Sequence, residues 1–218
     1  MNFEQARFNM IEQQVRPWDV LDQGVLELLA IVKREDFVPP AYRSMAFTDM
    51  EIPLADGQCM LAPRVEARLL QELGLKRHEK ALEIGTGSGF MAALMGHRAQ
   101  QVVTIESRLE LALKAKDNLR HADLMNVEVK HADGVAGDVG RGPWDAILLS
   151  GSVAEVPQRL LEQLKVGGRL LAIVGDLPVM RAVRITRQSE QGYVTTTLFD
   201  TVAQRLDNFP APKSAFRL

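Results

Sequence analysis

The sequence has little cysteine and little histidine. Cys59 is the only cysteine among 218 residues, and there are four histidines. One cysteine excludes an internal disulfide, and the histidines are too few and too scattered to form a structural zinc site with it. We therefore expect no bound metal and a reducing, cytoplasmic location.

Charge of one sign and long apolar runs are also scarce. The formal net charge is −2, so no global field would draw the chain onto nucleic acid or an anionic membrane. Residues 1–7 lack the apolar run of a signal peptide, and no later stretch approaches the roughly 20 apolar residues that span a bilayer. These absences predict neither a nucleic-acid partner nor a membrane partner.

The chain does contain enough apolar residues, 46% of the total, to bury one substantial core. Apolar periodicity predicts helices within residues 2–15 and 25–32, and Pro63 suits the first turn of a third helix that stops at Gly74. Residues 39–63 carry four prolines and no sustained period. We expect an irregular segment with a functional role there.

After residue 80, short apolar strands alternate with amphipathic helices. Strands are predicted at 81–84, 102–105, 127–130, 146–149 and 169–174, and helices at 90–95, 109–120 and 157–164. This alternation predicts a doubly wound α/β fold with a mostly parallel sheet. Residues 181–201 alternate apolar and polar side chains, which adds an antiparallel C-terminal section. The spacing of Ser107 and Glu110 is that of a capping box, so we expect Ser107 to cap the helix that follows.

The first of these strands leads into the glycine-rich loop Glu83-Ile84-Gly85-Thr86-Gly87-Ser88-Gly89. Such a loop lies in the crevice beyond the carboxyl end of the strand, where sheets of this class bind ligands. Glycine permits the tight turn, and we expect the first N–H groups of the next helix to remain available to a ligand. The glycines alone are weak evidence, because a strand-to-helix turn without a ligand can look the same.

Two acidic residues near the loop indicate which kind of ligand it binds. Glu106 ends the second strand 21 residues after Gly85, where a carboxylate can accept both hydroxyls of an adenosyl ribose. The glycines are spaced Gly-x-Gly-x-Gly, whereas a nicotinamide site prefers Gly-x-Gly-x-x-Gly and a pyrophosphate. Glu83 would repel a pyrophosphate but suits the cationic, phosphate-free S-adenosyl-L-methionine. Alternatively, Glu83 is the partner of a nearby cation or backbone amide.

Asp133 and Gly134 follow the third strand. The Asp133 carboxylate could accept a hydrogen bond from an adenine amino group, or it could form a local Asx turn. Taken together with the loop and the neighbouring strand end, these positions define a predicted cofactor site. Its residues are Glu83, Gly85, Thr86, Gly87, Ser88, Glu106, Ser107, Asp133 and Gly134.

Several segments make the chain resemble the protein-L-isoaspartate O-methyltransferase family. They are Ala81 to Phe90, Asp133-Gly134, Trp144 to Ile147 and Val156 to Leu170, with Phe37 to Pro39 and Ala46 to Leu54 upstream. The resemblance covers most of the chain. It implies a seven-stranded, Rossmann-like fold of the S-adenosylmethionine-dependent methyltransferases, and a substrate loop that opens at Gly57-Gln58. Residues 1–62 would then pack as N-terminal helices and substrate loop on a methyltransferase part, 63–218, within one structural domain.

The resemblance also implies the activity, which is methylation of a carboxylate at damaged aspartyl residues in proteins. The family's loop reads Gly-Gln-Thr-Ile-Ser-x-Pro, and here Cys59 replaces the threonine and Leu61 replaces the catalytic serine. No catalytic residue can therefore be carried over. The family's closing Val-Pro-Leu segment is likewise not evident in residues 199–205, so its substrate contacts cannot be carried over either.

Three functions stay open at this point. The first is isoaspartyl methylation, and the second is methylation of another acceptor, either a protein or a small molecule. The third is a catalytically silent protein that binds S-adenosylmethionine. A carboxylate acceptor is already ionised and needs no general base, so the loss of the serine need not be fatal; we expect cofactor binding to survive and isoaspartyl activity to be weak, absent or redirected. The sequence does not define the oligomeric state.

Overall fold

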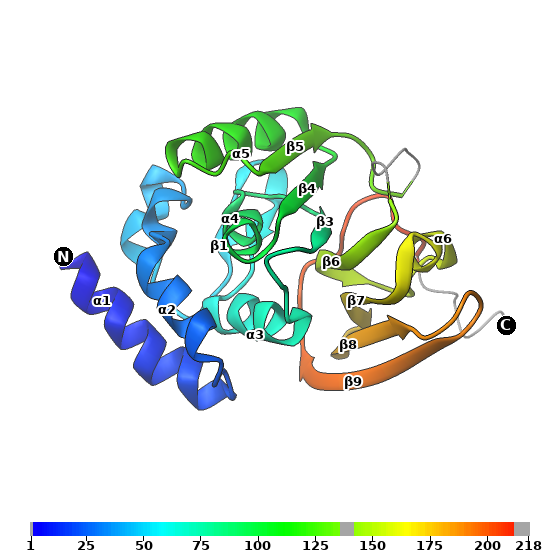
Figure 1. Ribbon diagram of the computed structural model, residues 1–218. Coiled ribbons are helices and arrows are strands. Elements are labelled where there is room, and N and C mark those ends of the chain that lie inside the picture. The colour runs from blue at the N-terminus through cyan, green and yellow to red at the C-terminus, as the bar shows by residue number, and fades with distance from the viewer. Residues whose placement is uncertain (1, 136–141, 212–218) are drawn as a thin grey trace, which may run out of the picture.

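A seven-stranded sheet forms the centre of the molecule (Figure 1). The computed structural model describes residues 2–135 and 142–211. Residues 136–141 and 212–218 of the expected methyltransferase part therefore lie outside the described residues. The spatial order of the strands is β5-β4-β3-β6-β7-β8-β9. Their bounds are β3 Lys80–Ile84, β4 Gln101–Glu106, β5 Val127–His131, β6 Trp144–Val153, β7 Leu164–Asp176, β8 Val179–Arg187 and β9 Tyr193–Thr201.

The first five strands of the sheet run parallel to one another. Strand β3 pairs in parallel with both β4 and β6, so Ile84 lies between Ile105 and Leu149. Strands β8 and β9 follow as an antiparallel hairpin on β7. The predicted α/β class with an antiparallel C-terminal section is therefore confirmed. Parallel pairing brings the carboxyl ends of β3, β4 and β6 to one edge of the sheet, where ligands of such folds bind.

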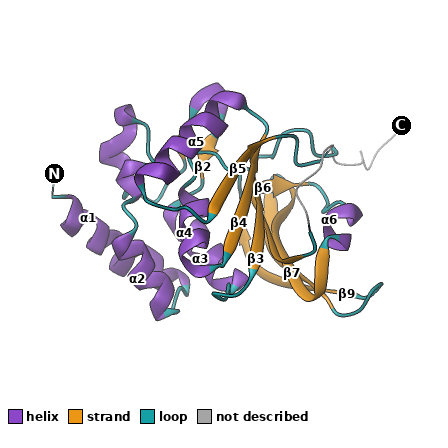
Figure 2. Cartoon of the chain, turned by 45° about the horizontal axis from the view of Figure 1, so that its top comes forward, coloured by secondary structure: helices purple, strands orange, loops and turns teal. Residues whose placement is uncertain are grey.

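Helices cover both faces of the sheet (Figure 2). Helices α3 (Pro63–Leu73), α4 (Phe90–Arg98) and α5 (Leu109–His121) lie on one face, and the short α6 (Gln158–Glu162) lies on the other. Helix α3 begins with Pro63 in its first turn and ends at Gly74, whose φ of 56° is left-handed. Both ends of α3 agree with the sequence prediction. Within the described residues, no helix is long and apolar enough to cross a membrane.

The N-terminal region packs on the same face as α3 and α4. Helix α1 (Phe3–Met10) continues into a π-helical turn, Ile11–Val15, and α2 spans Gln23–Ile31. The predicted first helix therefore has the expected length, but its second half is wound more widely than an α-helix. Buried side chains from both ends of the chain share one hydrophobic cluster; Met10, Leu29, Leu69, Leu94 and Met180 are among them.

Two local predictions were wrong. Residues 39–63 are not irregular throughout: a 3-10 helix spans Pro40–Met45, and β1 (Ile52–Pro53) pairs with β2 (Cys59–Met60). Burial of Ile52 and Met60 against the core drives this pairing, and strands of two residues carry no periodicity. Ser107 does not cap α5, because Arg108 occupies the N-cap position and its side chain makes no cap hydrogen bond.

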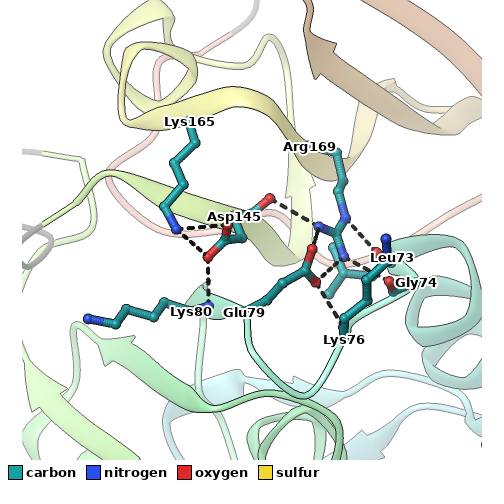
Figure 3. Close-up of polar contacts among 8 residues, drawn as sticks. All are labelled: Leu73, Gly74, Lys76, Glu79, Lys80, Asp145, Lys165 and Arg169. Carbon is teal, nitrogen blue, oxygen red and sulfur yellow. Dashed lines mark hydrogen bonds and ion pairs between the residues drawn. The ribbon is translucent and has the colours of Figure 1, made fainter.

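A polar cluster joins the amino ends of β3, β6 and β7, far from the glycine loop (Figure 3). The Arg169 guanidinium forms a bidentate pair with Glu79, with N···O distances of 2.7 and 2.8 Å. It also donates to the backbone carbonyls of Leu73, Gly74 and Asp145 at 2.7, 2.9 and 3.2 Å. Arg169 and Asp145 belong to the segments that carry the family resemblance, and their contacts here are structural.

Candidate functional site

The glycine loop leaves β3 at the edge where three strands end. Gly85, Gly87 and Gly89 have φ values of 94°, 52° and 86°, in the left-handed region that favours glycine. The N–H groups of Gly85 and Thr86 donate to the Ile105 carbonyl at 2.9 and 3.3 Å. The N–H of Gly89 donates to Thr86 at 2.8 Å. These bonds use N–H groups of the loop itself. The expectation concerns the first N–H groups of the next helix, where the Phe90 N–H donates to the Ser88 hydroxyl at 3.4 Å, and for that helix it stays a prediction.

Glu106 completes this internal bonding. Its carboxylate accepts from the Gly87 N–H at 2.9 Å and from the Arg108 N–H at 3.1 Å. Burial raises the pKa of Glu106 above its usual range, although these N–H bonds oppose the shift. A carboxylate that already occupies the loop N–H would repel a pyrophosphate. Its remaining lone pairs can still accept from hydroxyl groups.

Glu83 is fully buried at the end of β3. Its two oxygens accept from the hydroxyls of Thr104 and Ser150, each at 2.6 Å. The Thr86 hydroxyl lies 2.6 Å from that of Thr104 and extends this network. Burial raises the pKa of Glu83 to about 8, against the effect of both hydroxyls. The partners of Glu83 are therefore hydroxyl groups, and the alternative of a cation or a backbone amide as its partner is wrong.

Asp133 and Gly134 lie at the end of β5, as expected. Asp133 accepts from the Val135 N–H at 2.7 Å, which is the geometry of an Asx turn. Gly134 lies so close to Ile84 that an added Cβ would be 2.4 Å from its Cγ2 atom. Both residues also line a cavity with Glu106. The turn and the cavity position therefore coexist, and neither excludes the other.

All nine residues of the predicted cofactor site line two small neighbouring cavities. The adenosine-side cavity, as we name it, has a volume of about 50 Å³ and contains Gly85, Gly87, Glu106, Ser107, Asp133 and Gly134. The second, the inner cavity, has a volume of about 20 Å³ and contains Glu83, Gly85, Thr86, Gly87 and Ser88. The shared glycines show that the two cavities adjoin. The structure thus brings the predicted residues together, while their cofactor role stays a prediction.

The inner cavity meets an open groove at Leu61. This side chain lines the inner cavity and also a groove of about 1120 Å³ between the N-terminal region and the β7-β8-β9 section. Cys59 lines both small cavities. Burial and the neighbouring Glu51 carboxylate raise the pKa of the Cys59 thiol to about 12. Cys59 is therefore a neutral thiol, as expected of a small hydrophobic side chain.

Sequence reasoning missed a buried ion pair beside Leu61. Arg34 pairs with Glu66, and it also donates to the carbonyls of Leu61 at 2.8 Å and Ala46 at 3.0 Å. Its guanidinium lies 4.9 Å from the centre of the Phe90 ring, directly after the glycine loop. Burial raises the pKa of Glu66 to about 7, although Arg34 opposes the shift. Arg34 thus holds the loop that carries Leu61. Nothing in the local sequence around Arg34 indicated this contact.

Sequence reasoning also missed residues that are distant from the loop in sequence. Thr104 and Ser150 hold Glu83, and Leu206, Asp207 and Phe209 line the adenosine-side cavity. The only available signal was that Thr104 lies within the predicted strand 102–105 and that Ser150 directly follows the predicted strand 146–149. Within the described residues, no group of three or more His, Cys, Asp or Glu side chains could hold a metal ion.

The sheet and the residues at the carboxyl ends of its strands define a class of protein. A glycine turn that is flanked by acids and bonds most of its N–H groups to the protein, with carboxylates at adjacent strand ends, suits a phosphate-free adenosine derivative. This is the arrangement of a Rossmann-like methyltransferase. The family model described as protein-L-isoaspartate(D-aspartate) O-methyltransferase matches residues 5–205, and the chain belongs to this family.

Relatives and solved structures agree with that assignment. Protein-L-isoaspartate O-methyltransferases from Herpetosiphon aurantiacus and Geobacter metallireducens are 38% and 40% identical, over 89% and 87% of this chain and 87% and 88% of theirs. A Plasmodium falciparum chain assigned to this family, in complex with S-adenosyl-L-homocysteine, has a TM-score of 0.76 at 20% identity, covering 95% of this chain and 99% of that one. At this identity, the structure supports the fold.

Proposed function

We propose that this chain is an S-adenosyl-L-methionine-dependent O-methyltransferase whose acceptors are carboxylates at isoaspartyl residues in proteins. One observation carries the proposal: the buried carboxylates of Glu83 and Glu106 flank a glycine loop in which four of the five N–H groups from Gly85 to Gly89 are already bonded. That arrangement favours a cationic ligand without phosphate. Membership of the family supports the acceptor class.

Three carboxylates would hold the cofactor. Glu106 would accept from the ribose hydroxyls, because its carboxylate is held in place by two backbone N–H groups. Asp133 would face the adenine end of the same cavity. Glu83 would lie nearest the positive charge of the bound cofactor, in the inner cavity. When bound, S-adenosyl-L-methionine supplies a methyl group on a cationic sulfur.

The acceptor would enter through the groove and meet the inner cavity at Leu61. A carboxylate acceptor would be ionised at neutral pH, so its oxygen could take the methyl group that the bound cofactor would supply without help from a general base. The rest of the cofactor would leave as a neutral thioether, and no side chain of the protein would have to move a proton. The protein therefore has to position the acceptor and exclude water. Leu61 excludes water but offers no hydrogen bond to the acceptor.

The missing hydroxyl sets the expected rate. A hydrogen bond to a charged group contributes about 1.5–3 kcal/mol, which corresponds to roughly ten- to a hundredfold in rate. We expect turnover of isoaspartyl peptides to be slower by that factor than in a relative with the serine. Leu61 lines the inner cavity but not the adenosine-side cavity, so the loss of the hydroxyl should change cofactor affinity much less than turnover.

Two measurements test the proposal. Calorimetry should detect binding of S-adenosyl-L-methionine but not of a nicotinamide dinucleotide. Transfer of a labelled methyl group should be seen with an isoaspartyl peptide and not with the matched aspartyl peptide. Absence of cofactor binding, or equal methylation of both peptides, would contradict the proposal.

A different acceptor is the second candidate. The observation that favours it is the apolar junction of Leu61, Met60 and Cys59, where a neutral acceptor could replace a carboxylate. Glu66 lines the same cavity with a pKa raised by burial to about 7, which suits a group that takes up a proton. Cofactor binding without isoaspartyl turnover would favour this candidate.

A further inference from the structure

The described C-terminal segment Ala203–Phe209 closes the edge of the sheet where the cofactor site lies. It is fixed to β6 by three hydrogen bonds. The Leu206 N–H donates to the Ser152 carbonyl at 2.9 Å, and the Ser152 N–H donates to Gln204 at 2.8 Å. The Ser152 hydroxyl donates to the Ala203 carbonyl at 2.8 Å. The segment therefore lies against β6, which borders the glycine loop, although about 120 residues separate it from Gly85 in the sequence.

Leu206 is the part of this segment that enters the cofactor site. Its Cδ2 atom lies so close to the glycine loop that a Cβ at Gly85 would be 2.7 Å away, and one at Gly151 would be 2.8 Å away. Leu206 and Phe209 line the adenosine-side cavity together with Glu106. That cavity measures about 50 Å³, whereas ligand pockets measure about 300–1,000 Å³. An adenosyl group can therefore enter only if residues that line the cavity move, and Leu206 and Phe209 are among them.

Arg108 connects the covering segment to the rest of the site. Its guanidinium donates two hydrogen bonds to Asp207, at 2.8 and 3.1 Å. It also lies 3.5 Å from the carboxylate of Asp56. Asp56 is the first residue of the acceptor loop, as we name residues 56–63, which contain the expected substrate loop. The backbone N–H of Arg108 donates to Glu106. One residue thus contacts the C-terminal segment, the acceptor loop and the predicted ribose carboxylate.

A second contact joins the C-terminal segment and the acceptor loop directly. The Gln204 side chain donates to the Gly57 carbonyl at 2.7 Å. Asp56 has a left-handed φ of 55°, and the turn is closed by its own backbone bond from the Leu54 N–H to the Gln58 carbonyl at 2.7 Å. The contacts of Gln204 and Arg108 fix this turn to the C-terminal segment. Opening the covering segment would therefore also release the acceptor loop.

We infer that Arg108 is a positioning residue that couples cofactor enclosure to the acceptor loop. By pairing with Asp207 and Asp56 at once, it holds Leu206 over the adenosine-side cavity and keeps the acceptor loop in place. Breaking these ion pairs opens both together and lets the cofactor enter and leave. The inference rests on the proposed cofactor site. It adds a role for three charged residues in cofactor exchange and in the order of binding.

The rate of cofactor release tests this coupling. The full-length protein is loaded with tritiated S-adenosyl-L-methionine without acceptor, and release is followed after adding an excess of unlabelled cofactor. Exposed ion pairs contribute little, so Arg108→Gln should speed release about three- to tenfold. Asp207→Asn and Asp56→Asn should each speed it about two- to fivefold. High salt should speed release from the wild-type protein and much less from Arg108→Gln.

Matched variants separate this role from a general loss of structure. Arg120→Gln is the control, because Arg120 lies on the same helix, is 71% exposed and pairs only locally with Asp117; it should release cofactor at the wild-type rate. In the charge swap Arg108→Asp with Asp207→Arg, the pair between these two positions is rebuilt, but the new carboxylate at position 108 would repel Asp56, so release should stay faster than in the wild-type protein. Wild-type release rates for Arg108→Gln would overturn the inference, as would an effect of Asp207→Asn without one of Asp56→Asn.

A measurement without cofactor keeps the inference distinct from the proposed function. In the ligand-free protein, hydrogen exchange at the Leu206 amide should be faster in Arg108→Gln than in the wild type and in Arg120→Gln. Failure of the wild-type protein to bind S-adenosyl-L-methionine would overturn the proposed function. Unchanged exchange at Leu206 in Arg108→Gln would overturn the coupling by Arg108.

Discussion

Single side chains decide the chemistry at the junction between the groove and the inner cavity. Leu61→Ser restores a hydroxyl where the acceptor carboxylate would lie, so kcat/KM for an isoaspartyl peptide should rise about ten- to a hundredfold. Leu61→Ala is the matched control, because it removes the same bulk without adding a hydrogen-bond donor. The measurement is transfer of labelled methyl groups at several peptide concentrations. Equal gains in both variants would show that bulk, and not the hydroxyl, limits the reaction.

The buried carboxyl of Glu83 predicts a pH dependence. Its pKa is raised to about 8, so the carboxyl is largely neutral at pH 7, and a cationic ligand would favour its ionised form. Cofactor affinity should therefore rise between pH 6.5 and 8.5, roughly in step with this ionisation. Calorimetry in two buffers of different ionisation enthalpy should show proton release near pH 7. In Glu83→Gln this proton release should disappear, and if it persists another group is responsible.

The same carboxyl affects the stability of the ligand-free protein. An acid whose pKa is higher in the folded state binds more protons there, so stability is greatest below its unfolded value of 4.5 and falls up to about 8. Glu66, with a pKa of about 7, acts in the same direction. Urea unfolding should therefore show lower stability from these groups at pH 8 than at pH 6. Glu83→Gln should reduce that difference, whereas Glu128→Gln, at an exposed site on β5, should leave it unchanged.

At the scale of strands and helices, the polar cluster of Figure 3 stabilises the sheet without contacting the site. Asp145 joins β6 to β3 through the Lys80 N–H at 2.8 Å and pairs with Lys165 at 2.7 Å. Burial would raise the pKa of Asp145, but Lys165 and the Lys80 N–H lower it overall. The same balance, with Arg169 as the main partner, lowers the pKa of Glu79. Their contribution is therefore present at neutral pH and is lost as the pH falls below 4 or so.

Removing Arg169 should separate stability from function. Its side chain is 13% exposed and Glu79 would be left without its partner, so Arg169→Gln should cost about 2–4 kcal/mol of unfolding free energy. Cofactor affinity should stay within about twofold of the wild-type value, since the cluster lies at the opposite ends of the strands. Arg181→Gln is the matched control, because its pair with Asp200 is more than half exposed. A loss of affinity in Arg169→Gln at unchanged stability would contradict this assignment.

The elements that could be predicted are those with local signals. Pro63 and Gly74 mark both ends of α3, and the apolar strands locate β3, β4 and β6 because their periodicity is local. The glycine loop and its acids follow from the same strands. The β1-β2 hairpin could not be predicted, since it forms through burial of Ile52 and Met60 against distant residues.

At the scale of the whole molecule, the missed parts of the site come from far along the chain. Leu206 reaches Gly85, and Arg34 reaches Leu61, through contacts that no local pattern specifies. Sequence could place the carboxylates at strand ends because parallel strands end at one edge. It could not show that Glu106 already bonds the loop, because that depends on the orientation of one side chain.

The shared core predicts how the whole molecule unfolds. Because side chains of the N-terminal region and of the sheet form one hydrophobic cluster, and Arg34 joins the two through Glu66, thermal unfolding should be a single transition. Cofactor at a hundred times its Kd should stabilise the folded state by about 2.7 kcal/mol. For a chain of this size, that corresponds to a rise in Tm of roughly 5–10 °C.

Differential scanning calorimetry, with and without S-adenosyl-L-methionine, measures both quantities. In Glu106→Ala the rise in Tm at the same cofactor concentration should shrink to about 1–2 °C, because the ligand loses its predicted ribose acceptor and its Kd increases. Glu110→Ala is the control, because Glu110 is exposed in the first turn of α5; in this variant the full rise in Tm should remain. Two transitions, of which only one shifts in temperature with cofactor, would mean that the N-terminal region unfolds independently. The core that carries the cofactor site would then not fix the acceptor loop, which Arg34 holds.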